Sequence, residues 1–172
     1  MTRLSVFIAS SIDGYIATMD DKLDWLQSAG LPGEDYGYNE FMSTVDAVAM
    51  GRGTYDFIAD FDPVPYDERP VFVFTHRPPP ERNRFTFWQL SAREALAQWQ
   101  TMGYERVYVD GGSLISSFLA EGLIDDMLLT TVPLLLGEGR PLFHPISRQT
   151  PMTLTGSTSW PSGMINRTYS RA

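Results

Sequence analysis

Two glycine turns hold the residues of this sequence best suited to chemistry, because each turn stands where an apolar strand gives way to a helix. The first turn is Gly51, Arg52, Gly53 and Thr54, and the second is Gly111, Gly112 and Ser113. Glycine lets the backbone come close to a ligand, and the helix that follows offers unpaired N–H groups and its positive dipole end to an anion. Two such junctions on one sheet suit a ligand with more than one phosphate, which favours a dinucleotide cofactor.

Plain turn chemistry is the alternative interpretation, because glycine is common at strand-to-helix junctions and a Gly-Gly pair has little specificity. Arg52 favours an anion site, since its guanidinium is a phosphate donor that a turn does not need. The sequence contains neither Gly-x-Gly-x-x-Gly nor the Gly-Lys-Thr of a P-loop. Any nucleotide site is therefore of another design.

Twelve of the thirteen basic residues are arginines, and Arg77, Arg82 and Arg84 cluster just after an apolar strand. The fixed fork of arginine suits a phosphate better than the point charge of lysine does. Three prolines at 78–80 mark the same segment as irregular, so a solvated loop is an equal alternative for Arg82 and Arg84. The net charge of −8 argues against nucleic acid as a general partner.

The composition excludes other kinds of site. The chain has no cysteine, which rules out disulfides, thiolate nucleophiles and thiolate zinc sites. Its two histidines, His76 and His144, are far apart in sequence, so we expect no metal site. No apolar run reaches the length of a membrane span, and the first ten residues lack the pattern of a signal peptide. We expect a cytoplasmic protein with no membrane partner.

Apolar runs of strand length alternate with helical patterns, which predicts an α/β fold in one domain over residues 1–172. Strands are expected at 4–9, 45–50, 71–75, 85–90, 106–109 and 127–136, helices at 35–44, 53–60 and 113–121, and an irregular stretch at 10–33. Ser91 and Glu94 form a capping box for a further helix. This order predicts a mainly parallel central sheet with helices on both faces.

Two features concern the C-terminal half. The segments 153–160 and 164–171 alternate around a Pro-Ser-Gly turn, which predicts an antiparallel C-terminal hairpin. The run 127–136 is apolar on both faces, as in a central strand or one buried between subunits. We therefore expect a homodimer.

Four motifs occur in the order and spacing of one superfamily. They are Ala9–Ala17, Gly51–Tyr55, Val109–Gly112 and Pro133–Phe143. On these motifs the chain resembles the dihydrofolate reductase-like family, most closely the branch with the reductase domain of bifunctional riboflavin biosynthesis proteins. The resemblance covers nearly the whole chain. It implies the dihydrofolate reductase-like fold, a homodimer, and an NADPH-dependent reductase of a pteridine, dihydrofolate-like or related small heterocyclic substrate.

The resemblance also implies which residues contact NADPH. Ala9, Asp13, Gly14 and Ile16 would flank the nicotinamide; Gly51, Arg52, Gly53 and Thr54 the phosphates; Thr75, His76 and Arg77 the adenosine side with its 2′-phosphate; and Gly111, Gly112, Ser113 and Leu114 the pyrophosphate. A site for the 2′-phosphate favours NADP over NAD.

Hydride transfer to a C=N bond also needs a proton, so the folate branch implies a carboxylate near the substrate ring. Asp35 stands sixteen residues before Gly51, a spacing that resembles the acid position of the family. If it is partly desolvated, its pKa should be raised. The alternatives are that Asp35 is only an N-terminal helix residue, or that Glu34 is the acid. Thr130 is expected to hydrogen-bond the substrate, although threonine is also a good β-former.

The sequence departs from true folate reductases at two points. Trp25 and Leu26 are separated from Asp35 by serine, glycine and proline, and Gly53 stands where a basic residue is common. A riboflavin-pathway pyrimidine reductase is therefore an alternative, although no second arginine-rich motif is available for a ribityl phosphate. A non-catalytic nucleotide-binding module is the third possibility.

Overall fold

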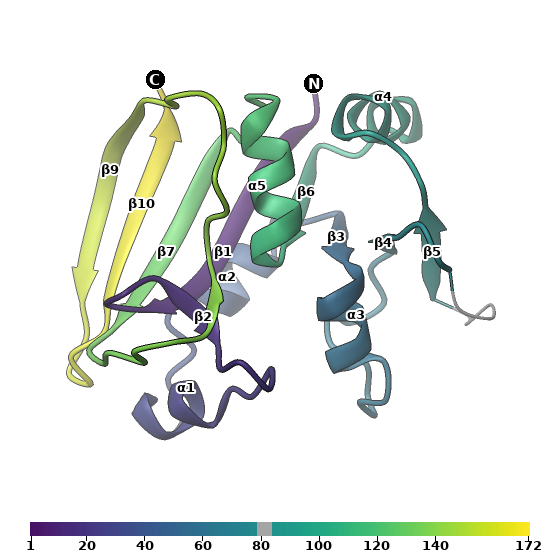
Figure 1. The fold of residues 1–172 in the computed structure, drawn as a ribbon. Coiled ribbons are helices and arrows are strands. Elements are labelled where there is room, and N and C mark those ends of the chain that lie inside the picture. Colours follow the sequence, from purple (N-terminus) through teal and green to yellow (C-terminus); the bar gives the residue numbers. More distant parts are fainter. Residues whose placement is uncertain (79–83) are drawn as a thin grey trace.

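The core of the fold is a mainly parallel sheet. In a computed structural model, which describes residues 1–78 and 84–172, one sheet has eight strands in the order β5-β4-β3-β6-β1-β7-β10-β9 among those residues (Figure 1). The strands are β1 (Arg3–Ser11), β3 (Ala47–Gly51), β4 (Val71–Phe74), β5 (Phe85–Trp88), β6 (Arg106–Asp110), β7 (Asp126–Val132), β9 (Met152–Ser159) and β10 (Ile165–Arg171). The strands from β5 to β7 are parallel, and β10 and β9 form the antiparallel hairpin. The predicted fold class is confirmed.

Helices cover both faces of this sheet. They are α1 (Asp24–Ala29), α2 (Tyr38–Met42), α3 (Arg52–Ile58), α4 (Ala92–Met102) and α5 (Gly112–Ala120). Successive residues of β3 point to opposite faces. Ala47 and Ala49 pack with α4 and α5, whereas Val48 and Met50 pack with α2 and α3. Burial on both faces explains why this strand is a continuous apolar run in the sequence.

The stretch 10–33 is more ordered than predicted. It contains β2 (Tyr15–Ala17), which pairs with β8 (Arg140–Pro141), and the helix α1. The six residues of α1 are too few to show a helical period, and Leu23 gives no side-chain cap. The helix predicted from residue 35 begins only at Tyr38, because Gly37 is its N-cap in a left-handed conformation with φ of 87°.

The strand predicted at 127–136 is a central strand, β7, as one of the two interpretations held, but its predicted C-terminal bound is wrong. The strand β7 ends at Val132 because Pro133 has no N–H to donate to a ladder, and Leu134 and Leu135 are exposed in the loop that follows. The strand β7 lies between β1 and β10, so its neighbours within this chain account for its apolar character. The homodimer stays a prediction without this support.

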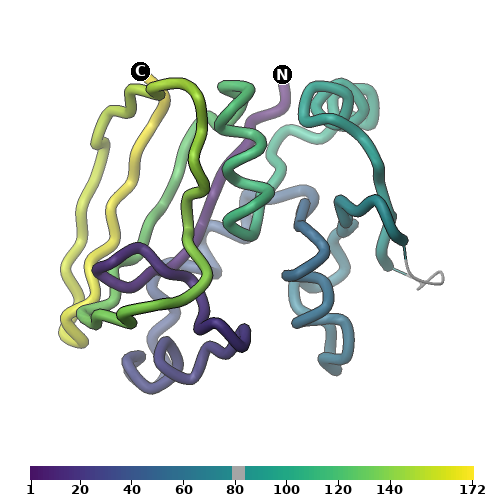
Figure 2. Tube along the Cα trace, viewed as in Figure 1, coloured from purple at the N-terminus to yellow at the C-terminus, as the bar shows by residue number. Residues whose placement is uncertain are grey.

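The parallel strands point their carboxyl ends toward one end of the molecule. Both chain termini lie at the opposite end, where β1 begins (Figure 2). Helices α1 and α3 and the strand β2 gather at the carboxyl-end side (Figure 1). No helix in the part of the chain that the structure describes is long and apolar enough to cross a membrane.

Candidate active site

A cleft of about 1380 Å³ follows the carboxyl ends of the parallel strands. Most of the predicted cofactor-binding residues line it, namely Ala9, Ile16, Gly51, Arg52, Gly53, Thr54, Thr75, His76, Arg77, Gly111, Gly112, Ser113 and Leu114. They come together because the carboxyl ends of parallel strands meet at one edge of a sheet. Their contact with a cofactor stays a prediction.

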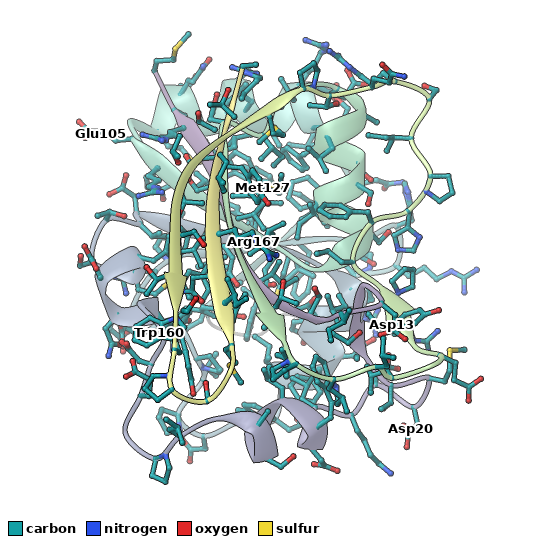
Figure 3. All side chains as sticks on the ribbon, turned by 90° about the vertical axis from the view of Figure 1, so that its left-hand side faces the viewer. Asp13, Asp20, Glu105, Met127, Trp160 and Arg167 are labelled. Carbon is teal, nitrogen blue, oxygen red and sulfur yellow. The ribbon has the colours of Figure 1, made fainter. Side chains whose placement is uncertain are left out.

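Asp13 and Gly14 do not line this cleft. The carboxylate of Asp13 accepts hydrogen bonds from the Ser11 hydroxyl at 2.6 Å and from the N–H groups of Leu136 and Gly137 at 3.1 and 2.8 Å. The bond from Ser11 is the main reason why the pKa of Asp13 lies below its usual value. Figure 3 shows Asp13 at the end of the molecule away from Glu105, which precedes β6. Asp13 thus fixes the loop that carries Ile16 into the cleft.

The two arginines of the cleft lie on connected turns. Arg52 donates through Nε to Asp56 at 2.7 Å and through Nη1 to the carbonyl of Arg77, also at 2.7 Å. The N–H of Arg77 donates to Oγ1 of Thr75 at 3.1 Å. These bonds join the first glycine turn to the predicted adenosine-side segment. Of the other arginines in the sequence cluster, Arg84 does not line the cleft and Arg82 lies outside the described residues.

The glycines of the second turn are required by packing within the chain. Gly111 has φ of 91°, and a Cβ added there would lie 2.6 Å from Oγ1 of Thr54. A Cβ on Gly112 would overlap the carbonyl oxygens of Pro141 and Leu142. Gly53 differs, since a Cβ there meets nothing within 4 Å. Turn and packing chemistry therefore explains the second pair of glycines without a ligand.

The helix ends in the cleft nevertheless suit an anion. Neither α3 nor α5 has a side-chain cap, whereas α4, as predicted, has a complete capping box formed by Ser91 and Glu94. The first N–H groups of a helix have no partner inside the helix. At the start of α5 these groups face a cleft that Arg52 and Arg77 also line, so the donor set fits a phosphate-containing ligand.

A second cavity of about 510 Å³ adjoins the cleft, and both are lined by Phe7, Ala9, Leu26 and Tyr38. Thr130 of β7 lines this second cavity, and its contact with a substrate stays a prediction. Its hydroxyl donates to Oδ1 of Asn166 at 2.9 Å, and Nδ2 of Asn166 donates to the carbonyl of Tyr36 at 2.7 Å. Because the Thr130 proton is used in this way, its oxygen can only accept a hydrogen bond from a ligand.

Asp35 and Glu34 also line the second cavity. The carboxylate of Asp35 accepts hydrogen bonds from the N–H groups of Asn39 at 2.9 Å and Gly37 at 3.0 Å. These bonds lower the pKa of Asp35, so the expected raised pKa is wrong. The two bonds stabilise the start of α2, which agrees with the alternative interpretation of Asp35 as an N-terminal helix residue. Its catalytic role stays a prediction.

The sequence interpretation gave no role to Asp110, the last residue of β6. Its carboxyl is enclosed by protein although part of the residue faces the cleft, and this desolvation raises its pKa. The Tyr66 hydroxyl donates to it at 3.0 Å and the N–H of Gly111 at 2.8 Å, which opposes the rise. Nearby, Tyr108 donates to the carbonyl of Phe7 at 2.8 Å. The sequence did contain a signal for Asp110, because a charged residue stands there at the end of a buried strand and directly before a Gly-Gly pair.

The tyrosines around Asp110 stay neutral. Burial, followed by the charge of Asp110, raises the pKa of Tyr38 to about 12 and that of Tyr66 and Tyr108 well above the usual value. All three line the cleft together with Phe7. No group of three histidine, aspartate or glutamate residues that could hold a metal occurs in the described parts of the chain.

The contrast between the glycines leads to a prediction on stability. Gly112→Ala should lower the free energy of unfolding by about 1–3 kcal/mol, because its Cβ would overlap backbone oxygens that cannot move aside. Gly53→Ala, the matched control in a helix with open space, should raise it by about 0.5–1 kcal/mol. Urea denaturation measures both. Equal effects of the two changes would contradict the close contact at Gly112.

Comparisons with known proteins agree with this architecture. Residues 2–166 match the RibD C-terminal domain family. The chain is 37% identical to the uncharacterized protein YwjB of Bacillus subtilis, over 91% of this chain and 92% of that protein. A crystal structure of a candidate riboflavin biosynthesis protein from Shewanella sp. PV-4 has a TM-score of 0.91 and 36% identity, and the similarity covers 99% of each chain.

Dihydrofolate reductase from Enterococcus faecalis, solved with NADP(H), has a TM-score of 0.66 and 20% identity over 98% of this chain and 96% of that one. At this identity the likeness concerns the fold alone. The resemblance stated from the sequence is confirmed. The chain belongs to the RibD C-terminal domain family and has the fold of dihydrofolate reductase.

Proposed function

We propose that this protein is an NADPH-dependent reductase of a small heterocyclic substrate of the pteridine or pyrimidine type. The observation that carries the proposal is the position of the two cavities, which share Ala9 and Phe7 as a common wall. The larger one contains both glycine turns and the two arginines, and the smaller one has the size of a small-molecule site. A cofactor in the first would lie next to a substrate in the second.

The residues of the cleft fit NADPH by their donor chemistry. Arg52 and the start of α5 would hold the phosphates that join the two nucleotides, and Arg77 would hold the 2′-phosphate. Gly53 leaves open space beside Arg52 for a close approach. When bound, the nicotinamide would supply a hydride to the substrate. Ile16 and Ala9 would exclude water from one side of that transfer.

Two carboxylates would carry out the remaining steps, which are substrate binding and proton donation. Asp35, whose pKa is lowered, is ionised at neutral pH and accepts hydrogen bonds from N–H groups of a heterocycle in the smaller cavity. Asp110, whose pKa is raised by burial, keeps its proton to higher pH. It lines the cleft and not the smaller cavity, so it would supply the proton that reduction needs to the part of the substrate that faces the nicotinamide. Tyr66, hydrogen-bonded to Asp110, would hold this carboxyl in place.

The reductase activity is tested by NADPH oxidation with a dihydropterin and with a ribosylaminopyrimidine, beside a titration of NADPH binding. We expect binding, and turnover of one of the two substrate classes. Binding without turnover of either would favour the non-catalytic nucleotide-binding module. A protein that does not bind NADPH would contradict the proposal.

The cofactor site predicts a specific loss for Arg77→Ala. NADPH binding should weaken by roughly 1.5–3 kcal/mol, the range for a hydrogen bond to a charged group, and NADH binding should weaken much less. Fluorescence titration of both cofactors measures the difference. Arg93→Ala is the matched control, because Arg93 pairs with Glu121 and lies outside the cleft. Equal losses for both cofactors would mean that Arg77 does not contact the 2′-phosphate.

Asparagine variants distinguish the roles of the two carboxylates. Asp110→Asn should retain NADPH binding and lose turnover by about 10²- to 10⁴-fold, the usual share of general acid catalysis. In the wild type, turnover should fall as pH rises through the raised pKa of Asp110, since the deprotonated form has no proton to give.

For Asp35→Asn we expect a raised KM, because a carboxylate that accepts hydrogen bonds from the substrate is lost, while the pH dependence of kcat remains. Steady-state kinetics between pH 5 and 9 measure all three proteins. If the pH dependence disappears in Asp35→Asn and persists in Asp110→Asn, the assignment of the proton donor is reversed.

A further inference from the structure

The smaller cavity has apolar walls and carries only negative charge. Leu26, Leu31 and Met164 contribute much of its apolar lining. The charged residues that line it are Glu34 and Asp35, and within residues 1–78 and 84–172 no arginine, lysine or histidine lines it. Asp35 is held in its ionised form by two backbone N–H groups. A ligand in this cavity therefore meets anions and no compensating cation.

Basic residues on neighbouring segments are engaged elsewhere. Lys22, just before α1, forms an ion pair with Asp20 at 2.7 Å, and Arg140 of β8 forms one with Asp21 at 2.8 Å. Arg167 of β10 donates to Oγ1 of Thr131 at 3.3 Å. Since successive residues of a strand face opposite sides, Thr131 and Arg167 lie on the other face of the sheet from the cavity residue Thr130. Figure 3 shows Arg167 on the hairpin, above Trp160 in that view.

Among the residues that the structure describes, the rim of the cavity offers no cation either. The exposed residues there are Gln27, Leu31, Pro32 and Asp35, none of which is basic. A tail that leaves the cavity toward solvent passes these residues and Glu34. An anion inside the cavity loses part of its hydration, and one at the rim is repelled by the like charges of Glu34 and Asp35.

This charge pattern does not suit the anionic groups of the two substrate types considered so far. Dihydrofolate carries the carboxylates of a glutamyl tail, and a phosphoribosylaminopyrimidine carries a phosphate. We propose that the substrate of this protein is a flat, neutral or cationic heterocycle that lacks an anionic tail, such as a non-phosphorylated pyrimidine nucleoside or a pterin without a glutamyl group. This inference rests on the proposed reductase function and names its substrate class.

The test uses two matched pairs of compounds with the NADPH-loaded protein. One pair is 5-amino-6-ribosylaminouracil with and without its 5′-phosphate, and the other is 7,8-dihydrofolate against 7,8-dihydropterin. We expect kcat/KM for the uncharged member to exceed that for the anionic member by about tenfold or more in the pair that is reduced. Calorimetric titration of all four compounds into protein saturated with NADP⁺ gives the same comparison as Kd.

A gain-of-function variant places a cation at the rim. Gln27→Arg changes an exposed side chain of α1 that lines the cavity, so the fold should tolerate it. It should improve binding of the anionic member relative to the uncharged one by about tenfold. Gln98→Arg adds the same charge to an exposed position of α4 that lines neither cavity, and should leave the preference unchanged.

The outcomes separate the substrate class from the reductase function. Equal or tighter binding of the anionic members overturns the proposed substrate class and leaves the cofactor site intact. Failure of all four compounds to bind, while NADPH binds, also overturns it. A protein that does not bind NADPH contradicts the reductase function itself.

Discussion

The close packing of the second glycine turn is the constraint on which the candidate site depends. Gly111 lies against Thr54 at the start of α3, and Gly112 lies against the carbonyl oxygens of the 141–142 segment. Three parts of the chain that are distant in sequence, the β6–α5 junction, the β3–α3 junction and the β8 region, therefore meet at positions where neither glycine could carry a Cβ. The cleft wall is continuous because these contacts leave room for hydrogen atoms only.

Most of the fold could be predicted from the sequence because the central strands are buried on both faces. Runs such as 47–50 and 107–109 stay apolar over their whole length, and both became strands. The errors arose where local signals were weak or ambiguous. The helix α1 is too short to show a period. In the run 127–136 the strand ends at Pro133, but the leucines that follow continue the apolar pattern although they are exposed.

The sequence identified most residues of the candidate site, but it did not predict how their pKa values are shifted. The glycine turns and Arg52 could be placed in one cleft from the order of strands and from family motifs. The sequence could not predict that the pKa of Asp35 is lowered, because this shift depends on two backbone N–H groups at the start of α2, where Gly37 is left-handed. Asp110 was within a quoted motif, yet its importance depends on enclosure by Tyr66 and Tyr108, which no spacing reveals.

The hydrogen bonds of Asp13 have a consequence for kinetics. They tie the loop after β1 to the backbone at 136–137, and the N–H of Leu142 holds the carbonyl of Gly14 at 2.9 Å. A wall fixed in this way is pre-organised, so little chain entropy is lost when a ligand settles against it. Binding and release of a ligand should then need no movement of this loop. For a ligand held in the cleft as proposed, we therefore expect the residence time to depend on its own contacts, chiefly with the arginines.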